Sequence, residues 1–366
     1  MGIDAIGIGE YEVAVYGRGG AQRVARLDRV DSLSFTRRLD DTGECSVTCV
    51  SEEWADLIHP WQHEIHIFRS GSLVWCGPVR DKSYVPENGQ VKITARDLFS
   101  WFDFRVPHDE LDFVDEDMAN VFVAIMESAL KPDKSPNIVI DKTPANIPTD
   151  FYHDPELPKI AATMLRDLAD SGVDFTTINR TIYVRNEEMD KESIGTLYSK
   201  HFATFPEIKE SGEMATLLLL TGAGGDFHSQ PDAVDTREAN SATAAIAVGK
   251  WDKDPFGLLE TIVDATSLFD AEDKTALEKS AKSRYELLRY PRLYLDSVTL
   301  HKSAPVAMSS LIPGRRLTLS MDIGSIPLIT EYRIQSVEVS VSNTAAETIS
   351  LTLTSVGDYS RDAVLQ

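Results

Sequence analysis

The chain has only three cysteines among its 366 residues. Two of them, Cys45 and Cys49, lie in the alternating run 44–50, which predicts a strand. Four residues of strand span ~13 Å, whereas a disulfide tolerates a Cα separation of at most ~7 Å. These two cysteines therefore cannot bridge each other, and we expect them to point with Val47 into a core. An odd count without a disulfide framework fits folding in a reducing cytoplasm.

The chain also lacks long hydrophobic runs and has few basic residues for its acid content. No stretch approaches the ~20 apolar residues that a membrane span needs, and residues 1–5 do not resemble the start of a signal peptide. Asp and Glu total 58 against 36 Lys and Arg, a net charge of −22. Residues 106–205 hold 19 acids and 9 bases, and so contribute −10. This acidity argues against binding to nucleic acid through phosphate neutralisation and against an anionic membrane surface.

What the chain does contain is one pattern that occurs twice, in residues 57–97 and 311–353. Each copy has runs of alternating apolar and polar residues separated by turn residues, which is typical of antiparallel strands. One offset of 254 residues aligns Leu57 and Ile58 with Leu311 and Ile312, and Ile65 and Ile67 with Leu319 and Met321. The repeat predicts two copies of one small β-domain, although any two antiparallel meanders share such a pattern.

We therefore predict an α+β chain that is predominantly β, with two similar antiparallel β-domains and two insertions. The first β-domain is expected at 1–105 and an α+β insertion at 106–205. The second β-domain is expected at 206–253 and 291–366, interrupted by a helical insertion at 254–290.

Local signals refine this division. The acids at 115–117 suit the first turn of a helix, and a second helix is expected to start within 154–158. A hairpin is predicted around Asn179 and Arg180. The run 216–221 predicts a strand of the second β-domain, and the apolar spacing within 254–290 predicts helix.

Two clusters have residue types that occur in chemical sites. His59, His63 and His66 lack the spacing of a zinc protease, and on a strand His63 and His66 point to opposite faces, so we interpret them as ordinary strand histidines. The glycine-rich run 222–225 lacks a phosphate-binding motif, and the following Asp226 would repel phosphate.

The acidic and aromatic residues do not indicate a binding site more clearly than the histidines and glycines do. The acids at 115–117 could bind Ca²⁺, but a position at a helix N-terminus also accounts for them. Exposed tryptophans could form a sugar-binding platform, whereas packing in a β-domain is the more frequent role; the residues in question are Trp54, Trp61, Trp75, Phe99 and Trp101. We predict no catalytic, cofactor-binding or metal-binding residue.

Two blocks resemble a known family. The segments 73–80 and 93–98, which include Trp75, Gly77 and Pro78, are similar to a recurrent stretch in minor tail proteins of long-tailed actinobacterial siphophages. The C-terminal segments 313–314, 332–334 and 348–353 are similar to the ending of the same family.

The resemblance implies a baseplate hub, or tail-tip protein, related to the hubs of contractile tails. Such hubs have two tube-type β-domains with two insertion domains and form homotrimers, in which six β-domains make a pseudo-hexameric ring. This ring adapts the sixfold tail tube to the threefold tip and forms part of the DNA conduit. The implied partners are the distal tail protein, the tape measure protein and other minor tail proteins. The implied location is the virion, after assembly in the host cytoplasm.

Two alternative functions belong to other classes of tail protein. A tail-associated cell-wall hydrolase is disfavoured because no Gly-x-Ser-x-Gly or zinc motif is present, but the 58 acids leave a glycosidase-like carboxylate pair open. A distal tail or receptor-binding module would favour a single tube-type domain.

A conduit for DNA also constrains the arginines near the start of the chain. A continuous basic band on the channel wall would retain phosphates. We therefore expect these arginines to lie in interfaces or to pair with Asp28, Asp31, Asp40 and Asp41; they are Arg18, Arg23, Arg26, Arg29, Arg37 and Arg38.

Overall fold

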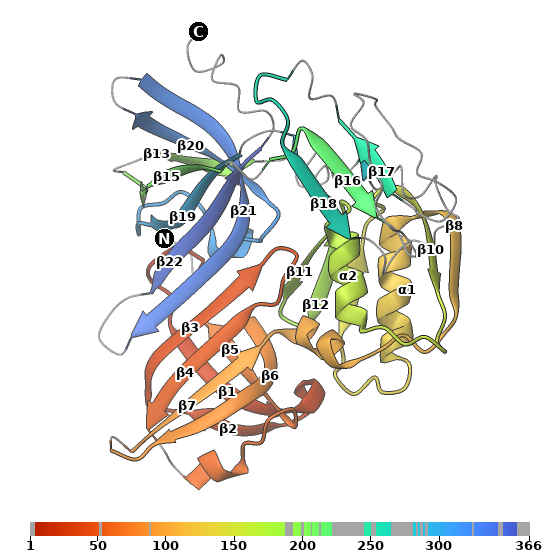
Figure 1. Cartoon of the computed structure of the whole chain (residues 1–366). Coiled ribbons are helices and arrows are strands. Elements are labelled where there is room, and N and C mark those ends of the chain that lie inside the picture. Colours follow the sequence, from red (N-terminus) through yellow and green to blue (C-terminus); the bar gives the residue numbers. More distant parts are fainter. Residues whose placement is uncertain are drawn as a thin grey trace.

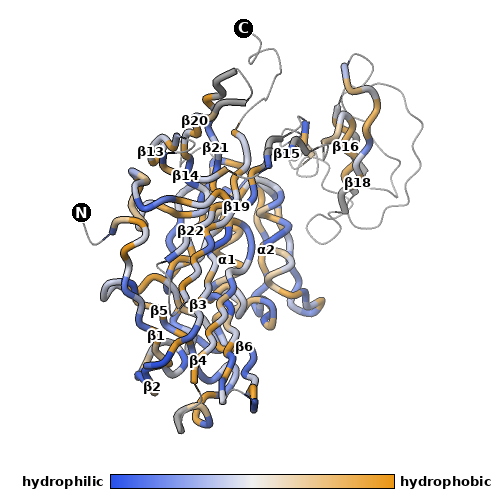
Figure 2. Tube along the Cα trace, turned by 90° about the vertical axis from the view of Figure 1, so that its left-hand side faces the viewer, coloured by the Kyte–Doolittle hydropathy of each residue, from blue (hydrophilic) through white to orange (hydrophobic). Residues whose placement is uncertain are grey.

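The computed structural model shows two β-rich bodies, with two helices and smaller sheets beside them (Figure 1). It describes residues 4–50, 53–87, 89–186, 193–198, 201–205, 207–211, 214–221, 245–249, 254–264, 281–282, 285, 288–289, 292–323, 326–342 and 347–356. Along the strands, hydrophobic and hydrophilic residues alternate (Figure 2), as expected for strands that bury one face. The predominance of antiparallel strands confirms the predicted fold class.

In the N-terminal β-body every neighbouring pair of strands is antiparallel. Its strands are β1 (Tyr11–Gly17), β2 (Arg23–Leu27), β3 (Val30–Arg38), β4 (Glu44–Val50), β5 (His63–Arg69), β6 (Ser72–Val85) and β7 (Gln90–Arg96). They lie in the order β3-β4-β7-β6-β5-β1-β2. Cys45, Val47 and Cys49 are buried along β4, as predicted, because alternate residues of a strand share one face.

The C-terminal β-body has a related arrangement. Its strands are β13 (Ser193–Tyr198), β14 (Ala203–Thr204), β15 (Ile208–Ser211), β19 (Arg292–Leu300), β20 (Arg316–Ile323), β21 (Ile326–Ser342) and β22 (Thr348–Ser355). The order β19-β22-β21-β20 repeats the order β4-β7-β6-β5 of the first body. Strands β14 and β15 both pair with β19. The outer strand differs, because β13 runs parallel to β20 whereas β1 runs antiparallel to β5.

Irregularities in the two bodies also coincide. The ladder between β6 and β7 shifts register between Val79 and Asp81. The ladder between β21 and β22 shifts between Ile334 and Ser336, which lie 255 positions further along the chain. A bulge is a specific local feature, so its recurrence at one place is stronger support for a duplication than alternation alone.

The turn before each hairpin repeats as well. Trp61 has a φ of 62° and Gly314 a φ of 94°. The Trp61 N–H donates to the Val79 carbonyl at 3.0 Å, and the Gly314 N–H donates to the Ile334 carbonyl at 2.8 Å. The predicted offset of 254 residues, which aligned Leu57 with Leu311, is wrong before this turn, since Leu57 is exposed and Leu311 is buried.

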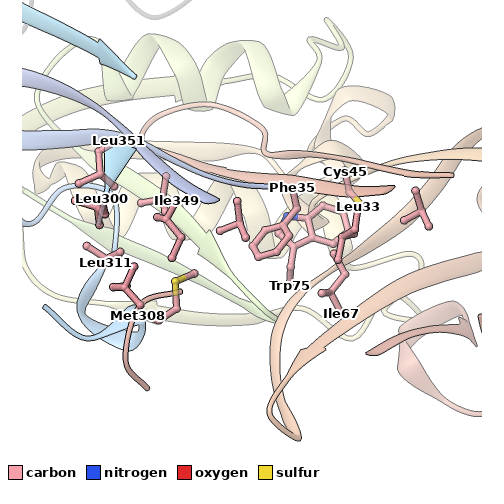
Figure 3. Packing of buried hydrophobic residues seen from close by; sticks show 14 of the residues in the cluster. Leu33, Phe35, Cys45, Ile67, Trp75, Leu300, Met308, Leu311, Ile349 and Leu351 are labelled. Carbon is pink, nitrogen blue, oxygen red and sulfur yellow. The ribbon is translucent and has the colours of Figure 1, made fainter. Parts of the chain in front are cut away.

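The two bodies share one sheet and one core. Ser336–Ser342 of β21 pairs antiparallel with Ser32–Arg38 of β3. A single hydrophobic cluster therefore runs from one body into the other. Figure 3 shows Phe35, Trp75 and Ile67 at one end of this cluster, and Leu311 and Ile349 at the other.

The insertion packs two helices against short strands around a second core. Its elements are β8 (Leu111–Asp117), α1 (Met118–Leu130), β9 (Val139–Lys142), β10 (Pro148–His153), α2 (Ala161–Ala169), β11 (Asp174–Ile178) and β12 (Thr181–Arg185). Short 3-10 helices span η1 (Arg18–Gly20), η2 (Glu53–Leu57), η3 (Leu98–Phe104) and η4 (Met308–Ser310). The hairpin around Asn179 is confirmed by the β11–β12 ladder and by the φ of 56° at Asn179.

Two helix predictions need correction. The second helix begins at Ala161 and not within 154–158. Leu157 closes a turn onto the Asp154 carbonyl at 3.0 Å, and the following Pro158 disfavours a helical conformation at Leu157. Within 254–290, Glu260–Asp264 forms strand β18, because its β-branched residues Thr261, Ile262 and Val263 suit a strand.

The second β-domain also differs from its predicted composition. Strands β16 (Leu217–Thr221), β17 (Ala245–Val248) and β18 form a separate three-stranded sheet. The buried residues Leu218, Leu220 and Val248 pack in the core of the insertion. Strands β13 and β14, predicted within 106–205, pair instead with the C-terminal body.

The two N-terminal segments that carry the family resemblance, 73–80 and 93–98, lie in close contact. A Cβ on Gly77 would lie 1.8 Å from the Arg96 carbonyl oxygen, so this close approach of β6 to the end of β7 requires glycine. Next along the chain, the Asp97 carboxylate accepts from the Gly43 N–H at 2.5 Å and from the Phe99 N–H at 2.9 Å. The second bond caps η3.

We expect Gly77→Ala to lower the free energy of unfolding by about 3 kcal/mol or more, because the obstructing atoms are backbone. Gly17→Ala is the matched control, since its Cβ would meet nothing closer than the Gln22 carbonyl at 3.9 Å and its φ is −64°. Urea unfolding of both variants measures the difference. Equal stability of the two variants would contradict the steric role of Gly77.

Candidate functional site

The predicted histidine cluster is split between two environments. The buried His66 Nε2 lies 3.2 Å from Glu64 Oε2, whereas His63 Nδ1 contacts the backbone of His59. Across the part of the chain that the structure describes, no group of three or more metal-ligating side chains occurs. The glycine-rich run 222–225 and Asp226 lie outside the described residues.

The acids at 115–117 end strand β8 and do not begin the helix. Asp117 is the N-cap of α1, where its Oδ1 accepts from the Ala119 N–H at 2.9 Å. The same carboxylate accepts from the backbone N–H groups of Ala145 at 3.1 Å and Asn146 at 2.7 Å. Through these bonds, Asp117 holds the loop at residues 145–146 against the start of α1.

The aromatic residues serve mainly in packing. Trp75 is buried and its Nε1 donates to the Thr36 carbonyl at 3.1 Å. Phe99 stacks on Phe175 of the insertion at a centroid distance of 4.2 Å. Trp101 is also buried, with the Arg18 guanidinium 5.1 Å from its ring. The side chain of Trp54 lies outside the described residues.

The most distinctive polar features are three buried ionic joints, each of which connects segments far apart in sequence. The first joins the N-terminal body to the insertion. Glu64 of β5 accepts from Arg180 Nη1 at 2.7 Å and from the Gly19 N–H at 2.8 Å, and it also contacts His66. Burial disfavours the ionised carboxylate, but His66, Arg180 and Gly19 together lower the pKa of Glu64 below its usual value.

The second joint connects β5 to the residue that precedes β22. Arg69 donates through Nε to Glu347 at 2.9 Å and through Nη2 at 2.5 Å. Glu347 also accepts from the Gly7 N–H at 2.6 Å and from the Tyr11 hydroxyl at 2.5 Å. Burial opposes ionisation of Glu347, yet Arg69 and Tyr11 hold its pKa below the usual value. Burial and the bond to Glu347 raise the pKa of Tyr11.

The third joint lies where both bodies and the insertion meet. Arg333 of β21 donates to Asp174 of β11 and, through Nε, to the Gly314 carbonyl at 3.1 Å. Asp40, just after β3, accepts from the Phe175 N–H at 2.8 Å. Burial, and then the neighbouring Asp174, raise the pKa of Asp40 well above its usual value. This joint fixes three separate segments against one another.

Four of the six N-terminal arginines form ion pairs in the described residues, two of them with the expected acids. Arg26 pairs with Asp28 at 3.2 Å and Arg38 with Asp41 at 3.2 Å, as predicted. Arg18 pairs instead with Asp133 of the insertion at 3.7 Å, and Arg23 with Glu12 at 3.8 Å.

Arg37 has a different role from the other arginines. It is buried, and it donates to the carbonyls of Val74 at 2.6 Å and Leu311 at 3.3 Å. Burial lowers its pKa to about 10. Because Leu311 belongs to the C-terminal body, Arg37 also connects the two bodies.

Sequence reasoning missed the ionic joints. In the sequence, Glu64 and Arg69 are simply charged residues within the alternating run 63–69, and their partners lie 116 and 278 positions away. The three thiols are buried, and burial raises the pKa of Cys76 to about 12, so Cys76 is a poor nucleophile. Taken together, the described polar groups hold segments in place.

We expect Arg69→Met to lower the free energy of unfolding by about 3–5 kcal/mol, because it leaves the buried Glu347 carboxylate uncompensated. Arg23→Met is the control: it removes an exposed pair, which contributes about 0–1 kcal/mol. Urea unfolding of the full chain compares them. A loss no larger than that of the control would show that this joint does not stabilise the fold.

The buried Asp97 predicts a pH dependence of stability. Burial raises its pKa from 3.8 to about 7, so the unfolded chain releases this proton at lower pH than the folded chain does. Its contribution to stability is therefore present below pH ~4 and is lost as the pH rises to about 7. Between pH 5 and pH 8 the native chain should lose more stability than Asp97→Asn, which cannot titrate. Parallel unfolding profiles for the two would contradict this assignment.

The comparisons with known proteins give similarity at the level of structure. No family profile and no curated protein matches the chain. A tail protein of Neisseria meningitidis has a similar structure, with a TM-score of 0.65 and 14% identity over 94% of this chain and 96% of that one. A 43 kDa tail protein of a Shewanella oneidensis prophage gives 0.61 and 12% over 93% and 98%. A prophage tail protein of Listeria monocytogenes gives 0.57 and 11% over 97% of both chains. The chain thus shares its overall fold with these three tail proteins.

Proposed function

We propose that this chain is a structural virion protein, the hub of a phage tail tip. The observation that carries the proposal is the internal duplication. The strands β5, β6 and β7 recur as β20, β21 and β22, with the same order and the same bulge. The fold of phage tail proteins supports a place in the tail.

The duplication gives the proposed assembly its symmetry. Three chains with two β-bodies each make a ring of six similar bodies. Such a ring can bind a sixfold tube on one side and a threefold tip on the other. An isologous dimer is the usual expectation for a soluble homo-oligomer, but it would place four bodies together and match neither symmetry. We therefore assign the two bodies as the tube-type domains, and the segment β8–β12 and the sheet of β16, β17 and β18 as the insertions.

The proposed ring encloses part of the DNA conduit and contacts the distal tail protein, the tape measure protein and other minor tail proteins. The net charge of −22 favours passage of DNA without retention. The pairing of Arg18, Arg23, Arg26 and Arg38 with carboxylates is consistent with a wall that carries no continuous basic band. A siphophage of an actinobacterial host is the source that the sequence motifs favour.

The proposal assigns no catalytic role to the chain. The histidine His66 and the carboxylates of Glu64 and Glu347 are each occupied by structural partners. No helix within the described ranges is long and apolar enough to cross a membrane.

We expect the purified full chain to sediment at high concentration as a particle three times the 40.6 kDa chain mass. We also expect three copies in each tail tip, counted in a reconstruction of isolated tails. Two or six copies in each tip would contradict the proposed ring.

A further inference from the structure

One edge of the N-terminal body is open. Strand β6 pairs with β5 only as far as Pro78, whereas its pairing with β7 continues through Asp81–Val85. Among the residues that the structure describes, none pairs with the other side of 81–85. Tyr84 and Val85 on this segment are 47% and 36% exposed. An open strand edge with exposed apolar residues is a ready site for the addition of another strand.

The second copy of the repeat shows the same edge in an occupied state. The coincident bulges place Asp81 at the position of Ser336 and Tyr84 at that of Val339. Ser336–Ser342 is covered by β3 of the first body. Val339 is fully buried there, whereas Tyr84 is half exposed. The pairing of β3 with β21 thus shows how a strand can cover the corresponding open edge of β6.

The strand that corresponds to β3 can be identified from the ladders. In the first body, Phe35 of β3 pairs with Cys45 of β4. In the second body, Ile208 of β15 pairs with Leu295 of β19. Because β4 and β19 occupy the same place in the two strand orders, β15 is the counterpart of β3. Its only described partner is β19, so its outer edge is also open.

We propose that residues 81–85 of β6 bind β15 of a second copy of this chain as an antiparallel strand. The register follows from the internal complex, in which Glu338 lies opposite Thr36. The same geometry places Ser83 of one copy opposite Lys209 of the next. This inference rests on the proposed ring, for which it specifies the surface that joins the chains.

The contact has a direct consequence for symmetry. Its two edges are different surfaces of the chain, so the interface is heterologous and each copy can engage two neighbours. A heterologous contact cannot produce an isologous pair, and it closes a ring when the rotation between copies permits. If each contact repeats the rotation between the two bodies within one chain, a closed ring has similar spacing throughout.

A cysteine pair in the full-length chain tests the register. Ser83 and Lys209 are both exposed, and directly opposed residues of antiparallel strands have Cα atoms about 4.5–5.5 Å apart, within the range of a disulfide. The native thiols are buried and do not compete. We expect oxidised Ser83→Cys/Lys209→Cys to shift on a non-reducing gel to bands of two and three linked chains, and no further.

The matched control uses the internal complex. Thr36→Cys/Glu338→Cys should close a disulfide within one chain and produce no linked chains. If this control closes while Ser83→Cys/Lys209→Cys remains a single-chain band, the proposed edge pairing is wrong. A trimer of the unsubstituted chain in sedimentation, together with an unlinked double variant, would overturn the edge pairing alone. Linkage that continues past three chains would instead overturn the ring of three.

Discussion

Strand β21 runs for 17 residues and takes part in both β-bodies. Its first half pairs with β20 and its second half with β3, while β22 follows it along the other edge. The bulge near Gln335 separates the two halves, and bulges bend a strand and increase its twist. One strand thus passes from one body into the next, and the hydrophobic core continues with it. The mutual placement of the bodies depends on this ladder.

The buried ionic joints refine that placement. Hydrophobic burial is not directional, so a continuous apolar core alone would tolerate small rotations between the bodies. Arg333 with Asp174, Arg69 with Glu347, and Arg180 with Glu64 each satisfy fixed hydrogen-bond geometry between segments distant in sequence. Because such pairs lose hydration when they are buried, their net contribution to stability is small compared with the cost of losing one partner. We therefore expect them to favour one arrangement of the segments over small rotations.

Local sequence pattern was sufficient where structure is local. Alternation along residues 63–69 and 90–96 predicted strands, and Asn179 and Arg180 marked a hairpin. The β-rich fold and the repeated strand order followed from these signals. Pattern was insufficient for 260–264, where apolar residues could be assigned to helix or strand and a parallel pairing with β16 decides the outcome. The ionic joints were also not predictable, since their partners meet only after the chain has folded.

The ladder between β3 and β21 also constrains how the chain is made. Thr36 of β3 emerges from the ribosome long before its partner Glu338, and at the usual ~5–20 residues per second the interval is roughly 15–60 s. Throughout that time the remaining strands of the first body can form, but the outer edge of β3 has no partner from its own chain. Neighbouring nascent chains carry the same sequence, so a polysome presents several such edges at once. Pairing between chains during synthesis is therefore a hazard created by the same long strand that unites the finished protein.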